Sequence, residues 1–149
     1  MIMKDMVISI TGVQQGQNAV EMVTQGQYGV ERDKICLSYD ESALTGMEGT
    51  RTSITVSPNR VEMQREGRNN SQMIFQEGEK HYFLYETPFG SATMGLDTRR
   101  IRTELGLHGG NIEIDYTIDL EQSVVGRNRF FIRVEEPKKS HTGDIRWPI

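Results

Sequence analysis

The chain has 149 residues, with 17 basic and 21 acidic side chains and a formal net charge of −4. This length suits one domain. The negative net charge argues against a strong electrostatic attraction to nucleic acid and excludes no other class of partner. Cys36 is the single cysteine, which excludes an intrachain disulfide or thiolate cluster and fits a reducing compartment. The N-terminus carries no long apolar run, so we expect a soluble, cytoplasmic protein without a membrane partner.

About ten strand-like runs follow one another, separated by turn residues. Most alternate apolar and polar side chains, the β periodicity. The His81–Tyr85 run is bulky on both parities, which predicts a central strand. The best helical candidate, Ser42–Gly46, is very short. In chain order the runs centre on Met6–Ile10, Val20–Val30, Ile35–Tyr39, Ile54–Val56, Val61–Met63, Met73–Phe75, His81–Tyr85, Met94–Leu105, Ile112–Leu120 and Arg127–Val134.

The Met94–Leu105 run changes parity near Asp97–Arg100, which predicts a β-bulge there. The glycine-rich stretch 106–110 is read as a hairpin turn, because it has no Lys-Ser/Thr of a phosphate loop and no helix after it. Tyr85–Gly90 is likewise read as a turn between two strands, with Gly90 at positive φ.

The last two runs predict one hairpin with a testable register. If acidic residues lie opposite arginines on the solvent-exposed face, Glu121 pairs with Arg127, Asp119 with Arg129 and Asp115 with Arg133. On the face directed toward the core, Leu120 then lies opposite Asn128. The loop between the two strands is Gln122–Gly126.

Consecutive hairpins and internal glycines predict an all-β fold, a single antiparallel and mostly up-and-down barrel of about 8–10 strands with little helix. An outer-membrane barrel is rejected, because no signal sequence is found and aromatic residues do not gather into girdles. We expect a barrel domain over residues 1–136 and a C-terminal tail over 137–149. The tail is either disordered or docks through Trp147 and Ile149.

Several short segments stand out in the sequence, namely Leu37-Ser38-Tyr39-Asp40-Glu41, Val61–Gly67, Tyr85–Gly90 and Ile112–Tyr116, followed by Asn128. They resemble the YwiB-like proteins, a family of bacterial proteins whose fold is a calycin or lipocalin-like barrel. The resemblance covers about residues 4–135 and implies the same barrel but no activity. True lipocalins carry Gly-x-Trp near the first strand, whereas this chain has Gly12-Val13-Gln14, so ligand chemistry does not carry over.

Some polar residues share the apolar parity of their strands and would face inward. A buried polar group costs about 1–3 kcal/mol unless it is hydrogen-bonded, so each needs a protein group, a water or a ligand. One interpretation makes Arg65 an anchor for a carboxylate or phosphate. The more economical one pairs Arg65 with Glu41 or Glu66, and lets Asn128 satisfy backbone groups. The candidate ligand-binding residues are Tyr39, Arg65, Tyr85, Thr87, Tyr116 and Asn128.

No metal or cofactor is expected, because the three histidines, His81, His108 and His141, are scattered. The arginines near residues 99–102 and 127–133 are matched by acids and lack stacking aromatics, so nucleic-acid binding is not expected. Three hypotheses remain in rank order. The first is a small-molecule binding module for an amphipathic or anionic ligand. The second is a structural or interaction barrel with a filled interior, acting as a homodimer. An enzyme comes last, because no catalytic residue is identified.

Overall fold

The computed structural model describes residues 1–120 and 123–138, and strands make up most of this part of the chain. The predicted tail lies outside the described residues from position 139 onward, so the division at residue 136 stays a prediction. The elements are β1 (Lys4–Gln14), β2 (Val20–Glu31), β3 (Lys34–Asp40), η1 (Ala43–Thr45), β4 (Thr50–Ser57), β5 (Arg60–Gly67), β6 (Ser71–Phe75), β7 (Lys80–Thr87), β8 (Gly90–Gly106), β9 (Gly109–Leu120) and β10 (Ser123–Glu135).

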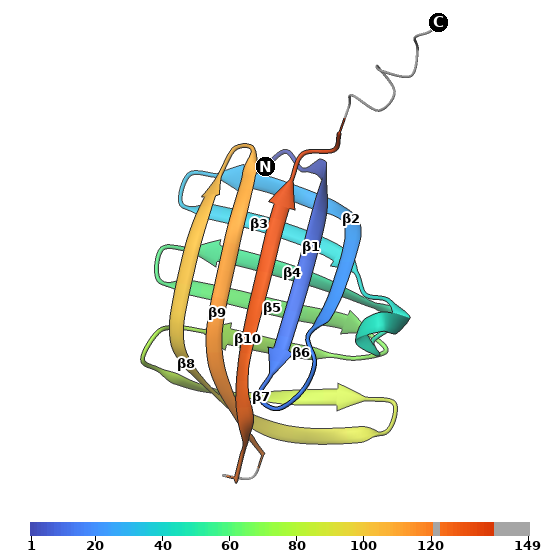
Figure 1. Ribbon diagram of the computed structural model, residues 1–149, viewed down its shortest axis with the longest axis vertical. Helices are drawn as coiled ribbons and strands as arrows, with labels where there is room; N and C mark the ends of the chain where they lie inside the picture. The colour runs from blue at the N-terminus through green and yellow to red at the C-terminus, as the bar shows by residue number, and fades with distance from the viewer. Residues whose placement is uncertain (121–122, 139–149) are drawn as a thin grey trace, which may run out of the picture.

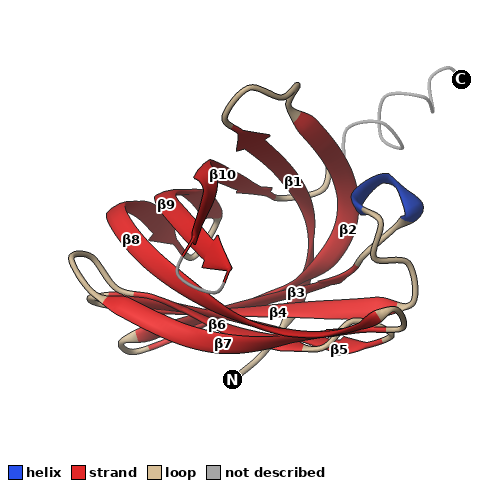
Figure 2. Cartoon of the chain, turned by 90° about the horizontal axis from the view of Figure 1, so that it is seen from below, coloured by secondary structure: helices blue, strands red, loops and turns tan. Residues whose placement is uncertain are grey.

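The strands form one antiparallel sheet in the order β6-β5-β4-β3-β2-β1-β10-β9-β8-β7. Consecutive strands are neighbours, except that β1 pairs with β10 and that β6 and β7 form the two ends of the sheet. Figure 1 shows β8, β9, β10 and β1 running nearly upright, while β3 to β7 cross behind them at a large angle. Seen from below, the sheet curls into a barrel (Figure 2). The predicted all-β, up-and-down barrel is therefore confirmed.

The predicted bulge is present, because the β8–β9 register shifts between Thr98 and Arg100. The extra residue on β8 accounts for the change of parity seen in the sequence. The 3-10 turn η1 is the only helical element in the described residues, and it lies within the predicted Ser42–Gly46 segment. Ser42 caps it by accepting the N–H of Leu44, and Gly46 ends it at a φ of 76°.

The predicted register of the last hairpin is wrong. Arg129 lies opposite Asp115 rather than Asp119, and Asn128 lies opposite Tyr116 rather than Leu120. The physical reason is that β10 already begins at Ser123, paired with Leu120, and a register shift follows between Val124 and Gly126. The error is four residues, an even number, so every side chain still has its predicted face.

The predicted central position of His81–Tyr85 is also wrong, because β7 is an end strand of the sheet. Phe83 is buried inside the barrel, but Tyr82 and Leu84 are 67% and 48% exposed. Large side chains on both faces of β7 do not indicate a central strand here, because no second layer covers the outer face of the barrel.

Apolar side chains of the inward parity fill most of the interior. Each fully buried aliphatic or aromatic side chain contributes about 1.5–3 kcal/mol, so this filling accounts for much of the stability. The buried apolar residues are Met6, Ile8, Ile10, Met22, Tyr28, Leu37, Tyr39, Ile54, Val56, Val61, Met63, Met73, Phe75, Phe83, Leu96, Ile112, Ile114, Phe130, Ile132 and Val134.

Candidate functional site: the polar end of the barrel interior

A row of inward-facing residues crosses five neighbouring strands at the end of the barrel that carries η1. The registers align Gly26 of β2, Tyr39 of β3, Thr52 of β4, Arg65 of β5 and Ser71 of β6. The row begins with glycine because a Cβ at Gly26 would lie 2.4 Å from the Ile8 side chain and 3.2 Å from the Tyr39 Cβ. The sheet therefore places four polar side chains next to one another inside the barrel.

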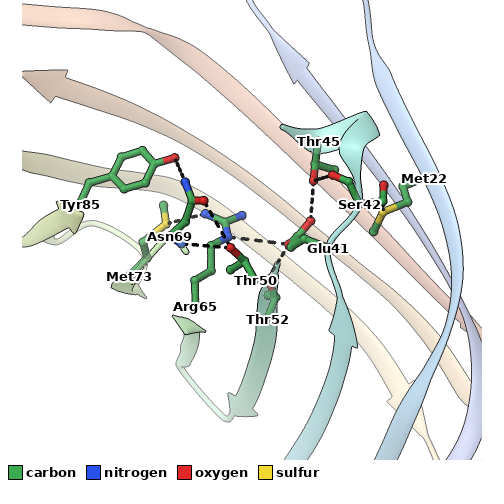
Figure 3. A network of polar contacts seen from close by, with 10 residues as sticks. All are labelled: Met22, Glu41, Ser42, Thr45, Thr50, Thr52, Arg65, Asn69, Met73 and Tyr85. Atoms are coloured by element: carbon green, nitrogen blue, oxygen red, sulfur yellow. Dashed lines mark hydrogen bonds and ion pairs between the residues drawn. The ribbon is translucent and has the colours of Figure 1, made fainter. Parts of the chain in front are cut away.

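Glu41 lies at the centre of this polar end, directly after β3. Its side chain is only 2% exposed, and its two oxygens accept hydrogen bonds from the hydroxyls of Thr45 (2.8 Å) and Thr52 (2.5 Å). The Arg65 Nε lies 3.8 Å from Glu41 Oε2 (Figure 3). The carboxylate is thus held by two hydroxyls and balanced by one guanidinium, as a buried charge requires.

Arg65 is less completely paired than Glu41. Its side chain is 15% exposed, and its nearest hydrogen-bond acceptor among the described residues is the sulfur of Met73, 3.7 Å from Nη1. The buried Nε of Arg65 has no hydrogen-bond partner among the residues that the structure describes. Because a guanidinium carries five N–H donors, Arg65 has donors available for a further acceptor.

Asn69 links a second group of side chains to this end. Its backbone N–H donates to the Thr50 hydroxyl (3.1 Å), and that hydroxyl donates to Asn69 Oδ1 (3.3 Å). The Asn69 Nδ2 donates to the hydroxyl of Tyr85 (3.3 Å), as Figure 3 shows. Tyr85 on β7 is therefore connected through Asn69 to the end of the barrel that contains Arg65.

The charge of Arg65 also affects the pKa values of Tyr39 and Tyr116. Burial raises the pKa of Tyr39, and the nearby Glu41 raises it further, while Arg65 opposes the shift. Burial likewise raises the pKa of Tyr116, again opposed by Arg65. The Tyr116 ring packs edge-on against Phe75 with centroids 5.1 Å apart. Both hydroxyls therefore stay protonated at neutral pH and can donate hydrogen bonds.

The other two candidate residues serve local structure. The Thr87 hydroxyl donates to the Gly90 carbonyl (3.1 Å) and accepts the Phe89 N–H (3.1 Å), which closes the β7–β8 turn. The Asn128 side chain donates to the Gly126 carbonyl (3.3 Å) at the irregular start of β10. Of the six candidates, the structure places Tyr39 and Tyr116 near Arg65, and Tyr85 bonds to Asn69, which in turn bonds to Thr50 on β4. The ligand-binding role of all six stays a prediction.

Sequence reasoning missed several residues of this site. Thr50 and Thr52 share the parity of Ile54, so the alternation that revealed Arg65 contained a signal for them. Ser71 shares the parity of Met73 in the same way. Asn69 lies in the connection between β5 and β6, where periodicity gives no information.

A cavity of about 210 Å³ opens beside Arg65 and Glu41, under η1. We call it the mouth cavity. Pockets for drug-sized ligands measure about 300–1,000 Å³, so this one suits a smaller molecule. Its lining combines the charged pair with Tyr39, Thr45 and Gly12 and an apolar wall formed by Ile10, Val20, Met22, Leu44, Met47 and Phe130.

Other features of the surface are less specific. A wider depression of about 600 Å³ crosses the outer face of the sheet near Arg102 and Arg133, but acids such as Glu104 and Glu113 also line it, and its lining is of mixed charge. Within residues 1–120 and 123–138, no three His, Cys, Asp or Glu side chains gather closely enough to hold a metal ion. In the same residues, no helix has the length and hydropathy needed to span a membrane.

The fold and the site define the class of protein: a ten-stranded, antiparallel up-and-down barrel with a buried Glu–Arg pair at one end of its interior. The chain belongs to the family described as a domain of unknown function (DUF1934), whose model matches residues 7–132.

One relative and one solved structure are similar to this chain. The chain is 30% identical over 100 residues to the "Uncharacterized beta-barrel protein YwiB" of Bacillus subtilis (strain 168), covering 67% of this chain and 69% of that protein. The crystal structure of the B. subtilis ywiB protein superposes with a TM-score of 0.81 at 24% identity, covering 91% of this chain and 94% of that one. The resemblance to YwiB-like proteins expected from the sequence is therefore confirmed, and so is the barrel.

Proposed function

We propose that the protein binds a small amphipathic molecule in the mouth cavity, with an oxygen acceptor of the ligand at Arg65. The observation that carries the proposal is a largely buried guanidinium with uncommitted donors beside an apolar-walled cavity. Among the described residues the terminal N–H groups of Arg65 bond to the Met73 sulfur alone, so a ligand oxygen would add a charge-assisted hydrogen bond that the protein does not supply.

The charges nearby limit the ligand to one acceptor group. Arg65 already balances Glu41, so a second carboxylate would face a buried negative charge as well as the guanidinium. Because Nε is the atom that faces Glu41, a single carboxylate or carbonyl would approach the terminal Nη groups, and a carboxylate can do so in a bidentate way. Tyr39 also lines the mouth cavity and has a hydroxyl that can donate to an acceptor.

The apolar wall defines the rest of the ligand. Ile10, Met22 and Phe130 are buried core residues, whereas Leu44 on η1 is exposed and lies at the rim. A short alkyl chain or a small ring would cover this wall and gain about 25 cal/mol for each Å² of apolar surface removed from water.

The test is a titration of the purified protein with hexanoate, followed by calorimetry and by NMR shifts of the Phe130 and Met22 signals. Arg65→Met is expected to weaken binding about 10- to 150-fold, because a hydrogen bond to a charged group contributes about 1.5–3 kcal/mol. Arg32→Met, in an exposed turn, is the matched control and should bind as the wild type does.

If Arg65→Met does not fold, Glu41→Gln/Arg65→Met replaces it, because that variant leaves no unpaired buried charge. The proposal is overturned if native mass spectrometry shows no retained small molecule and hexanoate binds the wild type and the Arg65 variant equally or not at all.

A second candidate function is that of an interaction barrel acting as a homodimer. The exposed Tyr82 and Leu84 on the end strand β7 favour it, because an end strand with apolar side chains invites pairing with another chain. Light scattering tests this candidate: a dimer that Leu84→Lys dissociates would support it, and a monomer at all concentrations would exclude it.

A further inference from the structure

The barrel wall is open between β6 and β7. At one end of this opening Asn70 and Glu86 exchange backbone hydrogen bonds of 2.8 and 2.9 Å. At the other end the chain itself runs from β6 to β7, and this connection is bonded to β8: Gly78 donates to the Thr98 carbonyl (2.9 Å) and Thr98 donates to the Glu79 carbonyl (3.3 Å). Between these points the described residues show no β6–β7 pairing. We call this opening the β6–β7 slit.

Backbone groups on both sides of the slit lack a partner in the sheet. In an antiparallel strand alternate residues direct their N–H and C=O groups to opposite sides. Since Asn70 and Glu86 bond across the slit, Gln72 and Ile74 on β6 and Leu84 on β7 direct their groups into it as well. Such groups need an acceptor or a donor from water or from a ligand.

The slit lies beside the polar end of the interior. A cavity of about 420 Å³ lies at the slit, and its lining includes the inward-facing Arg65 and Ser71 together with the outward-facing Gln64 and Gln72. The Ser71 residue is only 8% exposed, and its hydroxyl has no hydrogen-bond partner among the described residues. Arg65 is among the lining residues of the mouth cavity as well, so the two cavities lie on either side of the same residue of β5.

We infer that the ligand site continues past Arg65 into the β6–β7 slit, where it takes a neutral part of the ligand that carries hydroxyl or amide groups. This inference rests on the proposed function. The slit offers unpaired donors and unpaired acceptors together, which match hydroxyl or amide groups. A second anion is disfavoured, because Glu66 and Glu86 line the outer side of the slit and Glu41 already shares the charge of Arg65. The ligand class is therefore a short apolar chain, one carbonyl or carboxylate, and then a polar neutral group.

Two probes isolate the slit. Methyl hexanoate and 1-monohexanoylglycerol share the chain and the ester carbonyl, but only the second adds two hydroxyls. We expect the glyceride to bind about fivefold more tightly or better, since each new hydrogen bond contributes about 0.5–1.5 kcal/mol. Ser71→Ala should reduce the affinity for the glyceride about two- to tenfold and leave that for the methyl ester unchanged. Ser53→Ala, at an exposed position on the outer face of β4, is the matched control.

Thermal unfolding of the free Ser71→Ala variant gives an independent check. Because the hydroxyl lacks a partner without ligand, its removal should leave the Tm of the free protein unchanged or slightly raised. Equal affinities for the two esters, or a glyceride affinity indifferent to Ser71→Ala, would overturn the slit inference while hexanoate binding keeps the proposed function. Failure of hexanoate and both esters to bind would overturn the proposed function and this inference with it.

Discussion

The buried pair of Glu41 and Arg65 makes the most informative prediction about stability. Arg65→Met should leave the Glu41 carboxylate, 2% exposed, without its balancing charge. Breaking a buried pair from one side costs about 3–5 kcal/mol. Here the carboxylate keeps the hydroxyls of Thr45 and Thr52, and the ion pair is long at 3.8 Å, so the lower end of that range applies. We expect a loss of about 3 kcal/mol in the free energy of unfolding, or about 6–12 °C in Tm for a domain of this size.

The energetic coupling between Glu41 and Arg65 can be measured by urea unfolding at pH 7. The proteins compared are the wild type, Arg65→Met, Glu41→Gln and the double variant Glu41→Gln/Arg65→Met. The double variant leaves no buried charge, so it should be about 1–2 kcal/mol more stable than Arg65→Met alone. Additive effects of the two substitutions, or a loss below about 1 kcal/mol in Arg65→Met, would refute the view that Arg65 balances a buried carboxylate.

Three further predictions concern the barrel itself. Gly110→Ala should cost at least about 2 kcal/mol in urea unfolding, because Gly110 has a φ of 144° and its Cβ would overlap a backbone oxygen of the facing strand, whereas Gly106→Ala has open space and should cost much less. The hydrogen bond from Arg127 lowers the pKa of Asp115 in the folded protein. The ionised Asp115 therefore stabilises the fold at pH values above its unfolded pKa, near 4, and this stabilisation is lost as the pH falls through the folded pKa. Asp115→Asn should therefore reduce the loss of stability between pH 5 and pH 3, and an unchanged loss would contradict this. Leu96→Ala, at a fully buried position, should lower the free energy of unfolding by about 2–5 kcal/mol.

Alternation of side chains predicted most of the architecture correctly. The runs around Ile54–Val56 and Ile112–Leu120 became strands whose apolar side chains face the interior, except that Leu120 at the end of β9 is exposed. The change of parity near Asp97–Arg100 became the β8–β9 bulge. These features follow from the two-residue period of a strand, which is a local property of the chain. The same period placed Tyr39 and Arg65 inside the barrel.

Local periodicity could not predict which strands meet or how far they slide. The pairing of Arg129 with Asp115 depends on the short connection before Ser123 and on the irregularity at Gly126, which an acid–base pattern does not encode. Charge pairs on an exposed face contribute too little to decide a register against turn geometry. The end position of β7 likewise follows from the closure of β1 on β10, a contact between the two ends of the chain.

The candidate site divides in the same way between local and long-range causes. The sequence by itself determined that a few polar side chains would point into an apolar barrel, because parity assigns each residue a face. Only the tertiary structure decided that Glu41 balances Arg65, that Asn69 reaches Tyr85, and that the wall stays open between β6 and β7. Each of these depends on the curvature and closure of the whole sheet, which bring together residues that no local pattern relates.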